Sequence, residues 1–156
     1  MSDQIPCFTI LEGETPPSSS SCIHFKQGFA LDFPGRQRHS VLDETSNFAF
    51  SFNEEGLITC LEVLRRPQEM PQREVERSCL PEKKGLLRIE NREDLTDQNF
   101  SILTTYDEKN QLCEIRFSRI KPLIAFHYAP SIIEIGERGQ LSRIVIDLSG
   151  NCWEYV

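Results

Sequence analysis

The sequence has no apolar run near the roughly 18 residues that a membrane span needs, and its N-terminus has no basic segment followed by an apolar core. These absences predict a cytoplasmic protein without a signal peptide or membrane contact. Basic residues are also in the minority, because 17 lysines and arginines stand against 24 aspartates and glutamates, for a net charge of −7. This balance argues against nucleic-acid binding, which needs a basic face. It is compatible with a basic protein partner, and equally with simple solubility.

Local motifs of common catalytic and cofactor sites are also missing. There is no Gly-x-Ser-x-Gly elbow, no glycine-rich phosphate loop and no Cys-x-x-Cys among six scattered cysteines. We therefore expect reduced, structural thiols rather than disulfides. Cys22-x-His24 supplies only two of the three or four ligands that zinc requires, and His39 and His127 lie far from it in sequence. We expect no metal and no cofactor. The missing motifs favour a non-enzyme, and an enzyme without recognisable motifs stays open as a third interpretation.

One pattern is present three times, in residues 52–63, 106–117 and 135–146. Each copy begins with an apolar residue and a polar or glycine-containing turn. Asn53 and Asp107 are typical first residues of a type I turn, because their side chains accept hydrogen bonds from the backbone ahead. The position that needs a left-handed residue holds Gly56, Asn110 and Gly139. The pattern therefore predicts three β-hairpins.

The strands on either side of these turns have their own periodicity. Phe48, Phe50 and Phe52 alternate with smaller residues, which is typical of a half-buried antiparallel strand. In each return strand the apolar residues are spaced by three and then by two, which predicts a β-bulge just after the turn. These residues are Ile58, Leu61 and Val63, then Leu112, Ile115 and Phe117, then Leu141, Ile144 and Ile146.

The shared pattern, close to Asp-x-x-Gly-x-Leu-x-x-Ile-x-Ile, resembles the hairpin of a small, mostly bacterial domain family of unknown function. It is also similar to the Tyr-Asp repeats of large secreted toxins. The resemblance covers about a dozen residues in each copy and consists mainly of turn chemistry. Because the family is uncharacterised, the resemblance implies no activity and no catalytic residue.

The rest of the chain reads as further short strands. Residues 7–11, 22–33, 85–90, 123–128 and 152–156 are strand-like, with Gly28 interrupting the second of them. The single strands at 28–33, 85–90 and 123–128, each followed by a hairpin, suggest a larger repeated unit. A long polar excursion over 65–84 is expected to hold a short helix near 72–79. The prediction is an all-β fold with little helix, an antiparallel sandwich or barrel built from the three hairpins.

Two regions are distinguished along the chain. Residues 1–21 hold the first strand and a Pro/Ser-rich loop, and residues 22–156 are predicted to form a single all-β domain.

The candidate binding residues are Arg36, Arg38 and His39, in a small basic loop after Pro34-Gly35. Guanidinium groups bind carboxylates and other anions through paired hydrogen bonds, so this loop could hold a partner's carboxylate. Four more arginines would extend the site if the hairpin ends converge: Arg65, Arg66, Arg116 and Arg119. The acidic pairs Glu54-Glu55 and Asp107-Glu108 are expected at hairpin tips as exposed, solvated residues.

Two functions remain open on this evidence. The first is a non-enzymatic protein-interaction module, for example an inhibitor or immunity-type protein that neutralises a basic partner. The alternative is a β-barrel that encloses a small apolar ligand, since the chain has ten phenylalanines and closed β-structures can surround a cavity. Edge strands could also pair between subunits, so the oligomeric state stays open.

Overall fold

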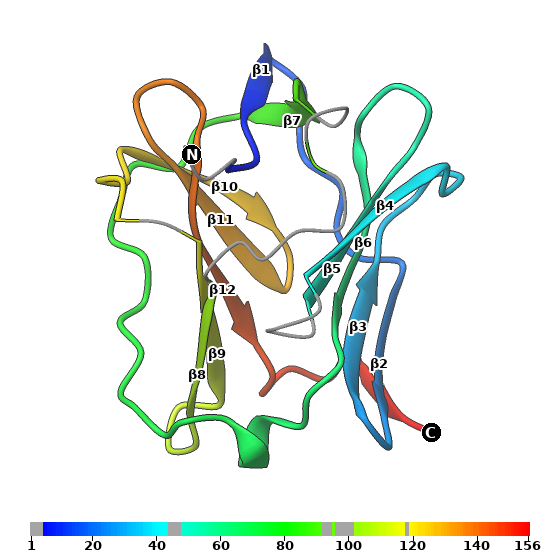
Figure 1. Cartoon of the computed structure of the whole chain (residues 1–156), viewed down its shortest axis with the longest axis vertical. Coiled ribbons are helices and arrows are strands. Elements are labelled where there is room, and N and C mark those ends of the chain that lie inside the picture. The colour runs from blue at the N-terminus through cyan, green and yellow to red at the C-terminus, as the bar shows by residue number, and fades with distance from the viewer. Residues whose placement is uncertain (1–4, 44–47, 92–94, 96–101, 118) are drawn as a thin grey trace.

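The computed structural model describes residues 5–43, 48–91, 95, 102–117 and 119–156. Two β-sheets face each other, and a two-stranded ribbon lies across one end (Figure 1). The predicted all-β sandwich is confirmed, and the barrel alternative is not adopted, since the sheets do not close on each other. Among the described strands, every pair is antiparallel except β13 (Trp153–Tyr155) with β2 (Ser21–Phe25), which is parallel.

The larger sheet has the order β13-β2-β3-β6-β5-β4. Its strands are β2 (Ser21–Phe25), β3 (Gly28–Asp32), β4 (His39–Asp43), β5 (Phe48–Phe52), β6 (Ile58–Val63) and β13 (Trp153–Tyr155). The second sheet has the order β10-β11-β12-β9-β8. Its strands are β8 (Leu103–Asp107), β9 (Leu112–Arg116), β10 (Ile124–Tyr128), β11 (Ser131–Ile135) and β12 (Leu141–Asp147). The ribbon pairs β1 (Phe8–Glu12) with β7 (Gly85–Ile89).

All three predicted hairpins are present, as β5–β6, β8–β9 and β11–β12. The bulge is confirmed in the first and third copies. In the first, Ser51 pairs with Cys60 and Phe52 with Ile58, which leaves Thr59 as the extra residue. The same shift leaves Ser142 as the extra residue in the third hairpin. In these two hairpins, the three-then-two spacing of apolar residues therefore correctly indicates a β-bulge, where one extra residue interrupts the pairing of the two strands.

The second hairpin does not follow this pattern. Its register runs without a shift from Tyr106↔Cys113 to Asp107↔Leu112. The left-handed residue is Gln111, with φ of 54°, and not the predicted Asn110. The turn occupies residues 108–111, and its left-handed residue comes one position later than in the first hairpin. Because the return strand has no bulge, its side chains alternate strictly between the two faces of the sheet. Leu112 therefore faces away from the main core.

The larger predicted repeat, a single strand followed by a hairpin, is wrong. The three single strands exist, as β3, β7 and β10, but each is used differently. Strand β10 pairs with the incoming strand β11, β3 pairs with the return strand β6, and β7 pairs with the distant β1. Strand β4 is not among the predicted strands, and its first residue, His39, lies in the predicted basic loop.

The break expected at Gly28 has a steric cause. Residues 22–33 form a tight hairpin of β2 and β3, and Gly28 begins the return strand. A Cβ atom at this position would lie 1.9 Å from the carbonyl oxygen of Val63. Only glycine permits the two backbones to approach this closely.

Aromatic rings form the core between the two sheets. Phe48, Phe50 and Phe52 share the inner face of β5, as predicted, and all three are buried. Phe117 meets this row from the other sheet, with ring centroids 5.3 Å from Phe48 and 5.4 Å from Phe50. Such pairs add about 0.5–1.5 kcal/mol each beyond the area they bury. The buried Tyr128 hydroxyl accepts a hydrogen bond from the Leu87 amide at 2.8 Å, which anchors the end ribbon to β10.

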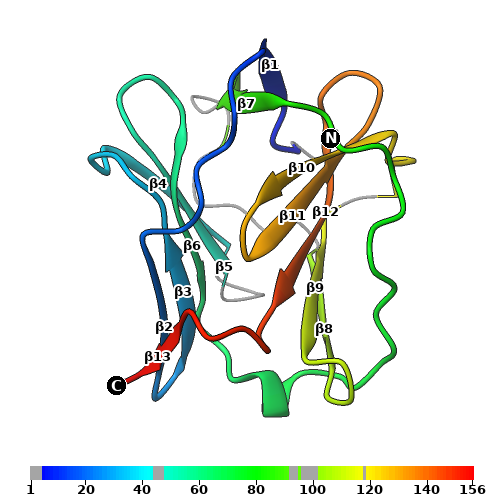
Figure 2. The ribbon, with the colours of Figure 1, turned by 180° about the vertical axis from the view of Figure 1, so that it is seen from behind.

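Residues 71–84, here called the strap, cross the outer face of the five-stranded sheet (Figure 2). At one edge of that sheet the strap exchanges backbone hydrogen bonds with Tyr106, whose amide donates to Pro71 and whose carbonyl accepts from Arg73. At the opposite edge it does the same with Ala125, through Pro81 and Lys83. Both edges of this sheet, β8 and β10, are thereby partly covered.

The helix predicted near residues 72–79 is not formed, because this part of the strap is extended. The only helix in the described part of the chain is the 3₁₀ helix η1 (Pro67–Glu69), just before the strap. Proline at 71 and 81 favours extended backbone in the preceding residues, and the strap's amides and carbonyls bond to sheet edges rather than to one another. Val75 anchors its middle, buried against Leu112 and Val145.

A buried charge network joins three strands of the same sheet. Arg143 on β12 donates from Nε to Glu134 Oε1 on β11 and from Nη1 to Glu114 Oε2 on β9, both at 2.7 Å. The three side chains are at most 10% exposed. An arginine placed between two carboxylates fixes the relative positions of the strands that carry them.

We predict that Arg143→Met will destabilise the protein by about 3–5 kcal/mol, because it leaves two carboxylates buried without a counter-charge. Urea unfolding will measure this loss. Arg138→Met, in the exposed turn of the same hairpin, is the matched control and should change stability by less than about 0.5 kcal/mol. Equal midpoints for the two variants would show that the network does not hold the sheet together.

Candidate functional site

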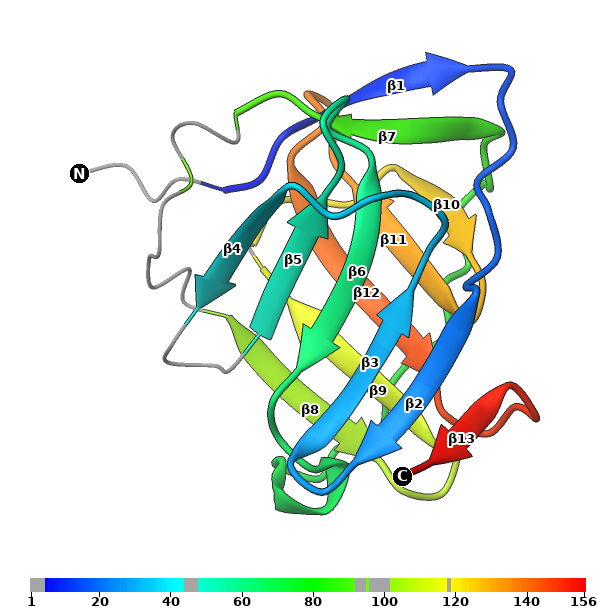
Figure 3. The ribbon, with the colours of Figure 1, turned by 90° about the vertical axis from the view of Figure 1, so that its right-hand side faces the viewer.

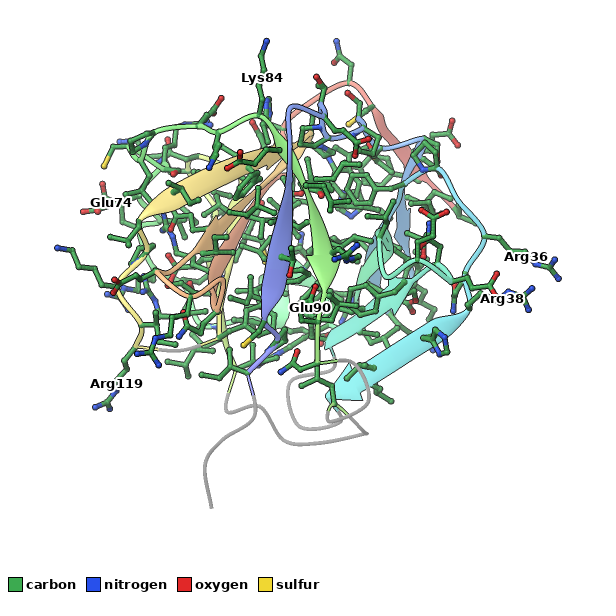
Figure 4. All side chains as sticks on the ribbon, turned by 90° about the horizontal axis from the view of Figure 1, so that it is seen from above. Arg36, Arg38, Glu74, Lys84, Glu90 and Arg119 are labelled. Atoms are coloured by element: carbon green, nitrogen blue, oxygen red, sulfur yellow. The ribbon has the colours of Figure 1, made fainter. Side chains whose placement is uncertain are left out.

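The structure places the predicted basic loop at one end of the six-stranded sheet. Arg36 and Arg38 lie between β3 and β4, and both project outward from the molecule (Figure 4). His39 is not in the loop but begins β4, and it too is exposed. The two arginines line a shallow hollow of about 340 Å³ together with Asn53, Glu54 and Glu55 of the first hairpin turn. Carboxylates of the same chain therefore lie in the same hollow as the loop's cations.

The other four arginines do not join this loop. Arg65 and Arg66 both bond to Glu69 beside η1, Arg65 to its carbonyl oxygen and Arg66 to its carboxylate. Arg116 bonds to Glu114 on the five-stranded sheet. Arg119 projects from the opposite side of the molecule (Figure 4). The extended arginine site considered from the sequence is therefore not formed.

Histidine and cysteine side chains are dispersed in a similar way. His24 lies on β2 and stacks on Tyr155 with ring centroids 4.7 Å apart, and burial lowers its pKa. The neighbouring Cys22 thiol is 2.9 Å from Ser19 Oγ. His39 and His127 lie on β4 and β10. Over the described residues, no three histidine, cysteine or acidic side chains are grouped as a metal site.

The acidic hairpin tips divide into two kinds. Glu54 and Glu55 are exposed, as expected, but Asp107 is buried and structural, which corrects the expectation of a solvated residue. Its carboxylate accepts hydrogen bonds from the Asn110 side chain at 2.9 Å and from the Val75 amide at 3.0 Å. These bonds, led by that from Asn110, lower the pKa of Asp107. Asp107 thus fastens the strap to the second hairpin.

The outer face of the six-stranded sheet, here called the open face, was not among the candidate sites identified from the sequence. The register puts alternate residues of β2 to β6 on it. They are Ser21, Ile23, Phe25, Ala30, Asp32, Ser40, Leu42, Ala49, Ser51, Cys60 and Glu62. In the described chain only the β3–β4 loop crosses this face, at one end (Figure 3).

Both charged side chains among these residues are carboxylates. Asp32 lies directly opposite Cys60, and Glu62 follows two residues later on the same strand. Neither carboxylate forms an ion pair with a described residue. Burial, and then the negative charges of Asp32 and Glu62, raise the pKa of the Cys60 thiol to about 12. The thiol is therefore protonated at neutral pH and is not a nucleophile.

A signal for this pair was present in the sequence. Asp32 alternates with Leu31 and Phe33, and Glu62 stands between Leu61 and Val63, so each carboxylate had to face away from the core. The pairing of β3 with β6 brings the two together. That pairing joins strands separated by β4 and β5, and nothing local in the sequence specifies it.

Comparisons with known proteins add no identification. No protein-family model matches the chain, and no curated protein is significantly similar to it. Among the described residues, no helix has the length and apolar character that a membrane crossing requires.

We predict that Asp107→Asn will lower stability most at neutral pH. The folded pKa of Asp107 is depressed, so its contribution is complete above the unfolded value of about 3.9 and is lost as the pH falls through the folded value. Urea midpoints of wild type and variant should differ clearly at pH 6 and converge as the pH drops below about 4. Glu108→Gln, at the adjacent exposed position, is the control. A difference in urea midpoint between wild type and Asp107→Asn that stays the same at every pH would contradict the assigned role of the Asp107 carboxylate.

Proposed function

We propose that the protein is a non-enzymatic interaction module that binds a basic protein surface on its open face. The supporting observation is that the outward side chains of this sheet carry two neighbouring carboxylates, Asp32 and Glu62, and neither is paired with a cation of the described chain. Lysine or arginine side chains of a partner would supply the missing counter-charges. The net charge of −7 favours the same kind of partner.

The shape of the open face suits contact with a folded protein. Side chains around the two carboxylates are small, including Ala30, Ala49 and Ser51, and Ser40 bonds to Ser51 across the strands at 3.1 Å. Small side chains at the centre of the face let long basic side chains of a partner approach closely. Half-buried apolar residues flank it: Ile23, Phe25 and Leu42.

The size of the face indicates that its rim takes part. Five strands spaced about 4.8 Å apart and about 17 Å long cover roughly 400 Å² in projection. A stable interface buries about 800 Å² on each partner. The loop holding Arg36 and Arg38 crosses one end of the face, so these arginines would meet acidic side chains at the partner's periphery. The predicted binding residues thus become the rim of a larger site.

An inhibitor or immunity-type role is one concrete form of this proposal. In that role the module covers a basic functional surface of its partner and blocks it. The small size and negative net charge of the protein motivate this role, and the carboxylates of the open face would attract a basic partner. The interaction should weaken with added salt, since exposed charge pairs are screened.

The decisive experiment compares two doubly neutralised variants. Wild-type protein is immobilised to capture its partner from the cells that make it, and the affinity of the purified pair is then measured. Asp32→Asn with Glu62→Gln should weaken binding at least tenfold, by removing the carboxylates that the partner's cations contact. Glu74→Gln with Glu76→Gln, on the exposed strap, removes the same net charge and should leave affinity within about twofold. Equal losses in both variants would contradict docking on the open face.

A further inference from the structure

All six cysteines are free thiols in the structure, but two of them, Cys22 and Cys152, meet where β13 joins the six-stranded sheet. Strand β13 runs parallel to β2 with Trp153 directly opposite Cys22, so Cys152 lies one residue away on the neighbouring strand. Because strands lie about 4.8 Å apart and rise about 3.3 Å per residue, this diagonal separates the two Cα atoms by about 6 Å. A disulfide bridges Cα atoms about 4.4–6.8 Å apart. The backbone therefore already has the spacing that a disulfide needs.

The two thiols also face each other. In a regular strand Cys152 would point away from Cys22, because the adjacent Trp153 shares the buried side of the sheet with Cys22. Cys152 instead belongs to the turn before β13, and its side chain interacts with the Cys22 thiol. Burial raises the pKa of Cys22 to about 11, and the interaction with Cys152 acts in the same direction. Cys22 is therefore a neutral thiol at physiological pH and loses nothing as a thiolate when it is oxidised.

The two cysteines differ in their access to solvent. Cys152 is exposed, whereas Cys22 is 2% exposed and its sulfur lies 2.9 Å from Ser19 Oγ. An oxidant from solution therefore reaches Cys152 first, and Cys22 lies behind it as the second thiol. An accessible cysteine beside a second, resolving cysteine is the arrangement that reversible thiol oxidation uses. Cys79 is also exposed, but it lies in the strap, over the other sheet.

We propose that Cys22 and Cys152 form a reversible disulfide that fastens β13 to β2 under oxidising conditions. The oxidant is a small disulfide of the glutathione class. The Cys152 thiolate attacks one of its sulfurs, which forms a mixed disulfide and releases one small thiolate. Cys22 then gives its proton to water, attacks the Cys152 sulfur and releases the second small thiolate. Two electrons pass from the protein to the oxidant, and the two protons end on the released thiols.

The bond would act on a strand that has few other restraints. Strand β13 is three residues long and lies at the edge of its sheet. Tyr155 and Val156 are 79% and 89% exposed, and the Val156 amide donates to the His24 carbonyl at 2.9 Å. Short, exposed backbone pairings of this kind open readily. The disulfide would hold the two strands together, and a cross-link that encloses most of the chain also restricts the unfolded state strongly.

The first test oxidises the folded protein with glutathione disulfide and maps the products by mass spectrometry. We expect a product lighter by two hydrogens, in which the peptides of Cys22 and Cys152 are linked, and its reversal by dithiothreitol. The same treatment in urea should scatter the pairings over all six cysteines, because unfolding separates the two thiols. Folded protein that forms no link between Cys22 and Cys152, or that joins Cys152 to another cysteine instead, would overturn the proposal.

The second test compares Cys152→Ser with the matched control Cys79→Ser, which removes the exposed thiol of the strap. In Cys79→Ser, as in wild type, oxidation should raise the thermal midpoint by about 10 °C and slow hydrogen exchange at the Val156 amide. In Cys152→Ser oxidation should change neither quantity. Each comparison is between the oxidised and reduced forms of one variant, so the substitution's own effect on stability cancels. A midpoint that stays unchanged or falls when the bond forms, or an equal rise in Cys152→Ser, would show that this disulfide does not fasten β13 to β2.

Discussion

The backbone hydrogen bonds that the strap makes with Tyr106 and Ala125 determine how the two sides of the sandwich differ. They hold an extended segment over the outer face of one sheet and cover part of both its edges. Val75 then has an apolar surface to pack against, and the Asp107 carboxylate bonds to its amide. The opposite sheet has no such cover in the described chain. The strap therefore covers part of one outer face, whereas in the described chain only the β3–β4 loop crosses the other, at one end (Figure 3).

The chain uses its charges in two distinct ways. Glu114, Glu134 and Arg143 form a buried network that joins β9, β11 and β12, and removing one member would leave a buried charge without its partner. Asp32 and Glu62 lie on the other sheet, at diagonal positions of β3 and β6, and neither is paired with a cation of the described chain. The first group is structural, because each carboxylate has its partner. The second group has no counter-charge among the described residues, and the proposed function assigns that role to a basic partner.

Local signals in the sequence predicted local structure well. Asn53 accepts the expected bonds from the amides of Glu55 and Leu57, and the spacing after Gly56 correctly indicated the bulge at Thr59. The same reasoning failed where tertiary contacts decide, as at Leu112, which turns outward to meet Val75. The strap has no periodic pattern, because its partners are sheet edges distant in sequence. The acidic pair of the open face depends on the pairing of β3 with β6, which also lies beyond the reach of local patterns.

Zero-length carbodiimide cross-linking of the protein with its captured partner tests the central claim most directly, since it joins a carboxylate to a lysine amine only where the two are in contact. The account predicts that cross-linked peptides contain Asp32 or Glu62. Cross-links that instead join the partner to Glu74, Glu76 or Glu82 of the strap, and leave the open face unmodified, would contradict it.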